Sequence, residues 1–256
     1  PRQKVCLRSL ACARSTKNKN CAFSHIQYGQ NTILLTDMAM QEQLKQVVIL
    51  GAGFAGLQAA RRLGKLLKHS SLRNQYRVLL LDQHAYHTYT PLLYEVATTD
   101  EQTANQLELK SLVTFPVVRS LRNLPIDFVR TKIVSVDSAR AELRTDTGTI
   151  ISYKVLLLAP GSEPNFFNIP GLAEHSYPLK TLIDSMHIRE ELLLLLTNSE
   201  APRLKIVIGG GGSTGVELAA EIIEFMEQNL CAYYHKCDIK RSDIRVHLVA
   251  ASPDVL

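Results

Sequence analysis

The fold is decided by QVVILGAGFAG, residues 46–56. A short apolar run ends at Gly51, and two further glycines follow at Gly53 and Gly56. An apolar run of this length that ends at a glycine is typical of a strand buried on both faces. Residues 55–68 follow with apolar side chains at helical spacing, and residues 76–81 (YRVLLL) are a second apolar run. The order of strand, glycine turn, helix and strand predicts a parallel α/β unit.

The three glycines suit a turn that binds a dinucleotide. Gly51 allows a tight exit from the strand, Gly53 lets the backbone approach a pyrophosphate, and Gly56 lets the helix pack against the strand. The helix start, which includes Ala55, offers free N–H groups and a positive dipole end. Asp82 ends the next strand, where its carboxylate can accept hydrogen bonds from an adenosine ribose. The alternative is a glycine-rich turn without a ligand.

A second unit of the same design begins at residue 204. It consists of a strand (204–209), a glycine turn, a helix (214–230) and a strand (244–250). Its candidate binding residues are Gly210, Gly212, Ser213, Thr214 and Gly215. Its second strand is followed by Ala250 and Ala251, so the expected acid is missing. Two such turns imply two dinucleotides, and enzymes that hold both commonly pass a hydride from a nicotinamide to a flavin.

The segment between the two units alternates strands and helices. We expect helices over residues 103–113 and 182–196, strands over residues 126–136, 140–144 and 149–158, and a hairpin turn at residues 146–148. The predicted fold class is α/β, with two Rossmann-like dinucleotide-binding domains (the FAD/NAD(P)-binding fold), of which the second is truncated.

The net charge of +5 comes from the first 45 residues. They carry seven Lys or Arg and two acids, which leaves 22 basic and 22 acidic residues in the rest of the chain. A nucleic-acid-binding protein is therefore not expected. The basic stretch is compatible with an organelle transit peptide. The alternatives are a disordered tail, an expression remnant, or translated sequence upstream of a start at Met38 or Met40.

Neither a membrane span nor a metal site is expected. The longest apolar runs are far shorter than the ~20 residues that cross a bilayer, which leaves attachment to a membrane surface open. The five cysteines are an odd number and match no disulfide framework. Cys231, His235 and Cys237 lie close together but lack a fourth ligand, so an ordinary helix end and loop is favoured over a metal site.

Three blocks in order resemble the type II NADH dehydrogenase family. They are DQHAYHTYTPLLYEVAT (82–98), NFFNIPGLAEHSYPLKTLIDSMHIRE (165–190) and GGGGSTGVELAAEI (209–222). The resemblance extends over residues 47–256. It implies that the first unit binds FAD and that the second binds NADH, with NADPH as the alternative because Ala250 replaces an acid. It also implies that the flavin reduces a membrane quinone by two electrons without proton pumping.

The resemblance also implies roles for individual residues. Gly51, Gly53, Gly56 and Asp82 would hold the adenine half of FAD, and the backbone around Lys132 and Ile133 would meet the adenine. Pro91 and Thr98 would lie near the flavin ring. Ala159 and Gly161 stand where related flavoproteins usually carry Ala-Thr-Gly, with Pro160 in place of Thr.

The second unit and the loop after Asp82 supply the other candidates. Gly210, Gly212 and Gly215 would cradle the NADH pyrophosphate. Glu217 would lie at the contact between nicotinamide and flavin, or would be a first-turn acid that satisfies the helix dipole. His84 and His87 are candidates for acid–base catalysis near the flavin, although a histidine in a loop is more often packed or solvated.

The expected domains are a basic tail (1–45), an FAD-binding domain (46–165), a linker and helix (166–202), and a partial NADH-binding domain (203–256). The expected partners are a membrane quinone, a membrane surface bound through a C-terminal region absent from this sequence, and a second copy in a homodimer. The expected location is the cytoplasmic face of a bacterial membrane. If the tail is a transit peptide, it is the mitochondrial inner membrane.

Other classes of flavoenzyme fit less well. Disulfide reductases and sulfide:quinone oxidoreductases need cysteines beside the flavin, and residues 82–108 contain none. A reductase for a protein electron carrier is the enzymatic alternative. The non-enzymatic alternative is an inactive N-terminal fragment, since a half-built second unit would leave a sheet edge unpaired and apolar faces exposed.

Overall fold

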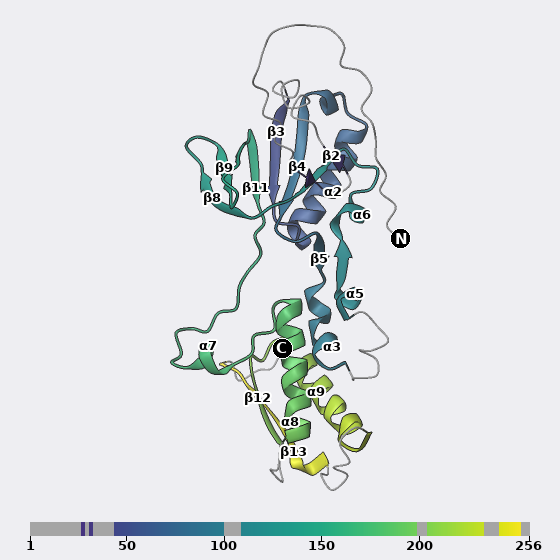
Figure 1. Cartoon of the computed structure of the whole chain (residues 1–256), viewed down its shortest axis with the longest axis vertical. Coiled ribbons are helices and arrows are strands. Elements are labelled where there is room, and N and C mark those ends of the chain that lie inside the picture. The colour runs from purple at the N-terminus through teal and green to yellow at the C-terminus, as the bar shows by residue number, and fades with distance from the viewer. Residues whose placement is uncertain are drawn as a thin grey trace, which may run out of the picture. The chain divides into compact units, whose positions relative to one another are not determined.

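The computed structural model describes residues 27–28, 31–32, 44–99, 109–198, 204–232 and 241–251. The chain divides into two units, residues 1–43 and residues 44–256. In the first unit, β1 (Gln27–Tyr28) pairs antiparallel with β2 (Asn31–Thr32). All other described elements belong to the second unit (Figure 1).

The second unit begins with a four-stranded parallel sheet in the order β11-β3-β4-β7. The strands are β3 (Lys45–Leu50), β4 (Tyr76–Asp82), β7 (Asp127–Arg130) and β11 (Val155–Leu158). Val48 and Ile49 of β3 point to opposite faces, and both are fully or almost fully buried. The predicted buried strand is therefore confirmed.

Different layers cover the two faces of this sheet (Figure 1). On one face pack the helices α2 (Phe54–Lys68) and α6 (Val117–Ser120), through a core of Ile49, Ala52, Leu57, Ala60, Leu67, Val78, Leu80, Val117 and Leu121. On the other face, Val48, Leu79 and Leu81 join Leu143 of an antiparallel sheet, β10-β9-β8. Its strands are β8 (Ile133–Asp137), β9 (Glu142–Thr145) and β10 (Ile150–Ser152). The result is a three-layer α/β/β arrangement.

Two strands that were expected to be continuous are each divided between these two sheets, so those two predictions are wrong. Residues 126–136 form β7 and β8, and residues 149–158 form β10 and β11. The first break occurs where the Thr131 N–H bonds to the Asp82 carbonyl while the Lys132 carbonyl accepts from the Asp146 N–H. Each break is only two residues long, Thr131-Lys132 and Tyr153-Lys154, and neither contains a glycine or a proline that would mark a change of sheet.

A connecting segment follows β4. Its strand β5 (Tyr86–Thr88) pairs antiparallel with β6 (Thr114–Pro116). Between them lie η2 (Thr90–Leu92), α3 (Leu93–Ala97) and α5 (Leu109–Val113). The helix expected over residues 103–113 is seen from residue 109 onward, and residues 103–108 lie outside the described residues. The short elements η1 (Ser71–Asn74), α7 (Leu172–His175) and η3 (Arg241–Asp243) complete the connections.

The second strand–turn–helix–strand unit has the predicted order. β12 (Leu204–Gly209) and β13 (Ile244–Val249) pair in parallel, and α8 (Leu182–Asn198) and α9 (Ser213–Ala232) accompany them. Their shared core consists of Ile188, Leu192, Leu196, Leu204, Ile208, Leu218, Ile222, Phe225 and Met226. On the other face of the two strands, Val207 and Val249 are exposed.

Helix α3 joins this second core. Ala97 is fully buried in the same cluster as Leu196 and Met226. The Nε–H of Arg189, on α8, donates to the carbonyl oxygen of Thr99 just after α3, at 2.8 Å. The segment that follows β4 therefore packs against the core formed by α8, α9, β12 and β13. None of the helices in the described part of the chain has the length and apolar character to cross a membrane.

Candidate functional site

The first glycine turn has the shape that its sequence predicts. Gly51 has a φ of +104°, and its N–H bonds to the carbonyl oxygen of Leu81 at 2.8 Å. A Cβ on Gly51 would lie 2.1 Å from the Ala159 carbonyl oxygen, and a Cβ on Gly56 would lie 1.8 Å from the Gly51 carbonyl oxygen. Both positions therefore require glycine because the backbones approach so closely.

At Gly53, by contrast, no close backbone contact among the described residues requires a glycine. Its φ of −70° suits any residue, and a methyl group added to its Cα would have none of the described residues beyond its chain neighbours within 4 Å. The absence of a side chain at this position leaves open space above the turn. A ligand that must come close to the backbone would use that space.

The start of α2 is free to receive an anion. Gly53 is its N-cap residue and makes no side-chain hydrogen bond, and the first turn carries no acidic residue. Among the described residues, neither the cap nor the first turn therefore offers a carboxylate or a capping side chain to the first N–H groups of the helix, including that of Ala55. Together with the helix dipole they favour a negatively charged group.

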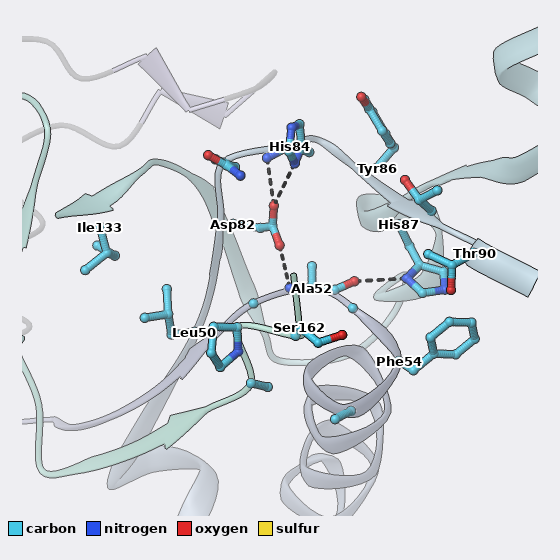
Figure 2. Close-up of a pocket in the computed structure, with 18 of the residues that line it drawn as sticks. Leu50, Ala52, Phe54, Asp82, His84, Tyr86, His87, Thr90, Ile133 and Ser162 are labelled. Atoms are coloured by element: carbon cyan, nitrogen blue, oxygen red, sulfur yellow. Dashed lines mark hydrogen bonds and ion pairs between the residues drawn. The ribbon is translucent and has the colours of Figure 1, made fainter. Parts of the chain in front are cut away.

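A cleft of about 740 Å³ lies over this turn (Figure 2). Seven of the sequence-predicted binding residues line it: Gly51, Gly53, Ala55, Asp82, Ile133, Ala159 and Gly161. Gly56 lies beneath the turn and is buried. Pro91 and Thr98 do not belong to the lining of this cleft; Pro91 lies in η2, and the Thr98 hydroxyl donates to the Tyr94 carbonyl at the end of α3.

Asp82 is held at the end of β4 by the backbone around it. One carboxylate oxygen accepts from the N–H of Ala52 at 2.6 Å, and the other accepts from the N–H of His84 at 2.7 Å. Two bonds leave accepting capacity on a carboxylate, which has about four lone-pair sites. The acid is therefore oriented toward the glycine turn and can still accept from a ribose hydroxyl.

The two candidate histidines have different surroundings. The His84 side chain is about half exposed, and its Nδ1 lies 3.6 Å from Asp82 Oδ1. His87 is buried, and its Nδ1 lies 3.1 Å from the Ala52 carbonyl oxygen. The ring of Phe54 packs against the His87 imidazole edge to face, with 4.7 Å between centroids. His87 is thus a packed residue that nevertheless faces the cleft.

Sequence reasoning missed Ser162 and Lys180, which also line the cleft. The Lys180 ammonium donates to the Ser162 hydroxyl at 2.8 Å. Lys180 comes from the connection into α8, far beyond the glycine turn along the chain. The folded connection alone brings it there, so neither spacing nor composition could have identified it.

These features together fit an adenine dinucleotide. Space is open beside the Gly53 backbone, the first turn of α2 contains no acidic residue, and Asp82 stands at the end of the neighbouring strand. The volume lies within the roughly 300–1,000 Å³ usual for small-molecule sites. Among the described residues, no group of three His, Cys, Asp or Glu could hold a metal ion, and His235 and Cys237 lie outside them.

The second turn repeats the geometry of the first. Gly210 has a φ of +125°, and its N–H bonds to the Val249 carbonyl oxygen at 2.8 Å, as Gly51 bonds to Leu81. A Cβ on Gly215 would lie 2.1 Å from the Gly210 carbonyl oxygen, whereas a Cβ on Gly212 would have none of the described residues beyond its chain neighbours within 4 Å. Gly210, Gly212 and Gly215 therefore correspond to Gly51, Gly53 and Gly56.

The correspondence identifies the residue that replaces the acid. Asp82 follows Leu81, and Ala250 follows Val249, so Ala250 holds the place of Asp82 in the second turn. A Cβ on Gly211 would lie 2.7 Å from the Ala250 Cβ, so Ala250 is close to the turn itself. Ser213 and Thr214 begin α9, and both are exposed.

Glu217 is exposed and is the fifth residue of α9, whose first turn contains no acid. The suggestion that it is a first-turn acid is therefore wrong, because the helix begins at Ser213. Glu217 lies near α3. Burial and the negative charges of Glu217, Glu95 and Glu221 raise the pKa of Tyr94 above its usual range.

Residues 45–256 match the profile of the pyridine nucleotide-disulphide oxidoreductase family. The chain is 27% identical over 223 residues to the type II NADH:quinone oxidoreductase of Staphylococcus aureus (strain NCTC 8325 / PS 47), and 26% identical to that of Staphylococcus epidermidis. Both matches cover 85% of this chain and 52% of the relative, so the chain spans about half the length of these relatives.

Solved structures show the same fold. The NDH2 of Plasmodium falciparum in complex with NADH has a TM-score of 0.64 at 23% identity, over 83% of this chain and 43% of that one. The sulfide:quinone oxidoreductase of Aquifex aeolicus has a TM-score of 0.63 at 21% identity, over 82% and 44%. The chain belongs to the pyridine nucleotide-disulphide oxidoreductase family, and within it the chain resembles the type II NADH dehydrogenases.

Proposed function

We propose that this protein is an FAD-dependent NADH:quinone oxidoreductase that takes a hydride from NADH and passes two electrons to a quinone without pumping protons. The names of the relatives from Staphylococcus support NADH and a quinone as substrates. The observation that carries the proposal is the presence of two glycine turns with the same geometry in one chain. Two such turns provide for two dinucleotides, as transfer from a nicotinamide to a flavin requires.

In this proposal the cleft over the first turn holds FAD. A flavin held there would supply the site that accepts the hydride and releases electrons singly or in pairs. Gly53 and the α2 start would face the pyrophosphate, and Asp82 would accept from the ribose. Lys132 and Ile133 line the adenine end of the same cleft in this assignment. Pro91 and Thr98 remain proposed neighbours of the flavin ring.

The second turn would bind NADH through Gly210, Gly212, Ser213, Thr214 and Gly215. Glu217 is proposed to lie at the contact between the two cofactors. Its proximity to Tyr94 of α3 supports this, because α3 continues the segment that leaves the FAD cleft. Ala250 places no carboxylate beside the ribose position, so NADPH is the alternative co-substrate.

The wider assignments belong to the same proposal. Residues 46–165 would form the FAD domain, residues 166–202 the linker, and residues 203–256 part of the NADH domain. Quinone reduction would take place at a membrane surface, bacterial or mitochondrial, and the protein would form a homodimer.

The test is an anaerobic titration of the purified, FAD-loaded chain with NADH, followed through the flavin absorbance band. The proposal expects bleaching by NADH and recovery on addition of a short-chain ubiquinone or menaquinone analogue. Recovery with a ferredoxin and not with a quinone would support a reductase for a protein carrier instead. A chain that retains FAD but is not bleached would be an inactive fragment.

A further inference from the structure

His87 has an environment unlike that of the other ionisable residues of the cleft. Along the described lining, Asp82, His84, Tyr86, Lys132, Glu163 and Lys180 are partly or fully exposed, and only His87 is buried. Its ring is fixed on one side by Phe54 and on another by the Ala52 carbonyl oxygen. A buried polar ring in such a place needs a reason beyond packing.

The contact with Ala52 determines which ring nitrogen carries a proton. A carbonyl oxygen can only accept a hydrogen bond, so at 3.1 Å the Nδ1 of His87 must be the donor. The neutral ring is then the Nδ1–H tautomer, in which Nε2 carries no hydrogen.

The Ala52 carbonyl belongs to the same planar peptide group as the Gly53 N–H. In a trans peptide these two groups point in opposite directions. Fixing the carbonyl toward His87 therefore fixes the Gly53 N–H away from His87. Asp82 holds the preceding peptide plane in the same manner, because it accepts from the Ala52 N–H. Figure 2 shows Asp82 and His87 on opposite sides of Ala52.

We propose that His87 is a positioning residue that orients the Ala52–Gly53 peptide for dinucleotide binding. The inference rests on the proposed function, since it takes FAD as the ligand of this turn. The peptide needs an external constraint because glycine leaves the rotation about its φ soft. Without the Nδ1–H donor, the peptide plane can rotate, and the Gly53 N–H no longer holds one direction.

The first test reads the tautomer and requires no FAD. Long-range ¹H–¹⁵N correlation spectra of the chain at pH 8 report which ring nitrogens of each histidine are protonated. The His87 signals are assigned by their loss in His87→Gln. A proton on Nδ1 of His87 is expected. An Nδ1 without a proton would overturn the proposal, whether or not the chain binds FAD.

The second test compares FAD dissociation constants for three variants by flavin fluorescence quenching. His87→Asn places an amide N–H at the position of Nδ1, whereas His87→Gln places it near Nε2 and His87→Leu removes it. We expect His87→Asn to bind within about threefold of the unchanged chain, and the other two to bind roughly tenfold more weakly, which is the worth of one hydrogen bond. Far-ultraviolet circular dichroism checks that each variant folds.

The Asn and Gln variants decide the outcome if His87→Leu does not fold. Equal affinity for all variants, or a His87→Gln variant that binds better than His87→Asn, would overturn the proposal. An unchanged chain that binds no FAD would contradict the proposed function instead, and the tautomer would still test the role of His87.

Discussion

Gly53 and Gly56 stand three residues apart but are glycines for different reasons. A methyl group on Gly53 meets none of the described side chains or backbone, so Gly53→Ala should melt within about 1 °C of the unchanged chain. The same methyl group would occupy the space of the proposed pyrophosphate, and we expect FAD affinity to fall at least about tenfold. Thermal melts and fluorescence quenching measure the two effects.

Gly56→Ala is the matched control for that substitution. Its methyl group would stand 1.8 Å from the Gly51 carbonyl oxygen, so the helix must move away from the strand. We expect a loss of about 3 kcal/mol of stability. If Gly53→Ala destabilised the chain as much as Gly56→Ala, Gly53 would be a structural glycine and not a binding one.

Ala250 stands where the first turn has Asp82, which makes it a test of nucleotide preference. Ala250→Asp should place a carboxylate beside the ribose of the second dinucleotide. It would repel the 2′-phosphate of NADPH and accept from the 2′-hydroxyl of NADH. We expect the ratio of NADPH to NADH dissociation constants to rise about tenfold. Calorimetric titration of both nucleotides measures it, and Ala251→Asp, which should leave the ratio unchanged, is the control.

At the scale of elements, α8 contains five consecutive leucines, Leu192–Leu196, and the sequence does not reveal that only Leu192 and Leu196 of these are buried. In the structure Leu196 is 1% exposed within the second core, whereas Leu194 is 49% exposed. Leu196→Ala should therefore cost about 2–5 kcal/mol, and Leu194→Ala about 0.5 kcal/mol or less. Chemical denaturation of both variants measures the difference, and equal losses would contradict this placement of the helix.

The elements also show what could be predicted from the sequence. The strands and helices beside each glycine turn were predictable, because a buried parallel strand is a continuous apolar run and a glycine marks its end. The division of residues 126–136 and 149–158 between two sheets was not, since only two residues separate the strands at each break and neither break contains a glycine or a proline. Helix α3 was missed because five residues are too few to show a helical period.

The candidate site likewise contains residues that could be predicted from the sequence and residues that could not. Gly51, Gly53 and Asp82 were identified because the turn is local in sequence and each residue has a geometric reason. Lys180 and the contact between His87 and Ala52 depend on segments far apart in the chain. Only the packed structure brings such segments together, so no local pattern records them.

At the scale of the whole unit, α3, in the segment after β4, packs against α9, which begins at the second glycine turn, and carboxylates gather where these helices meet. Burial, followed by the charges of Glu224 and Glu95, raises the pKa of Glu221 above its usual range. A carboxyl whose pKa is higher in the folded state favours folding while it is protonated. Its ionisation then weakens the fold as the pH rises through that higher pKa.

Replacement of Glu221 by glutamine should therefore stabilise the unit at neutral pH. We expect Glu221→Gln to be more stable than the unchanged chain at about pH 7.5 by about 0.5 kcal/mol, the usual scale for a partly exposed site. The difference should disappear near about pH 4, where an ordinary carboxyl is largely protonated. Denaturant unfolding at both values measures it, with Glu174→Gln, an exposed carboxyl outside α3 and α9, as the control. A gain that is the same at both pH values would mean that glutamine improves packing, and that the charges between α3 and α9 do not oppose folding.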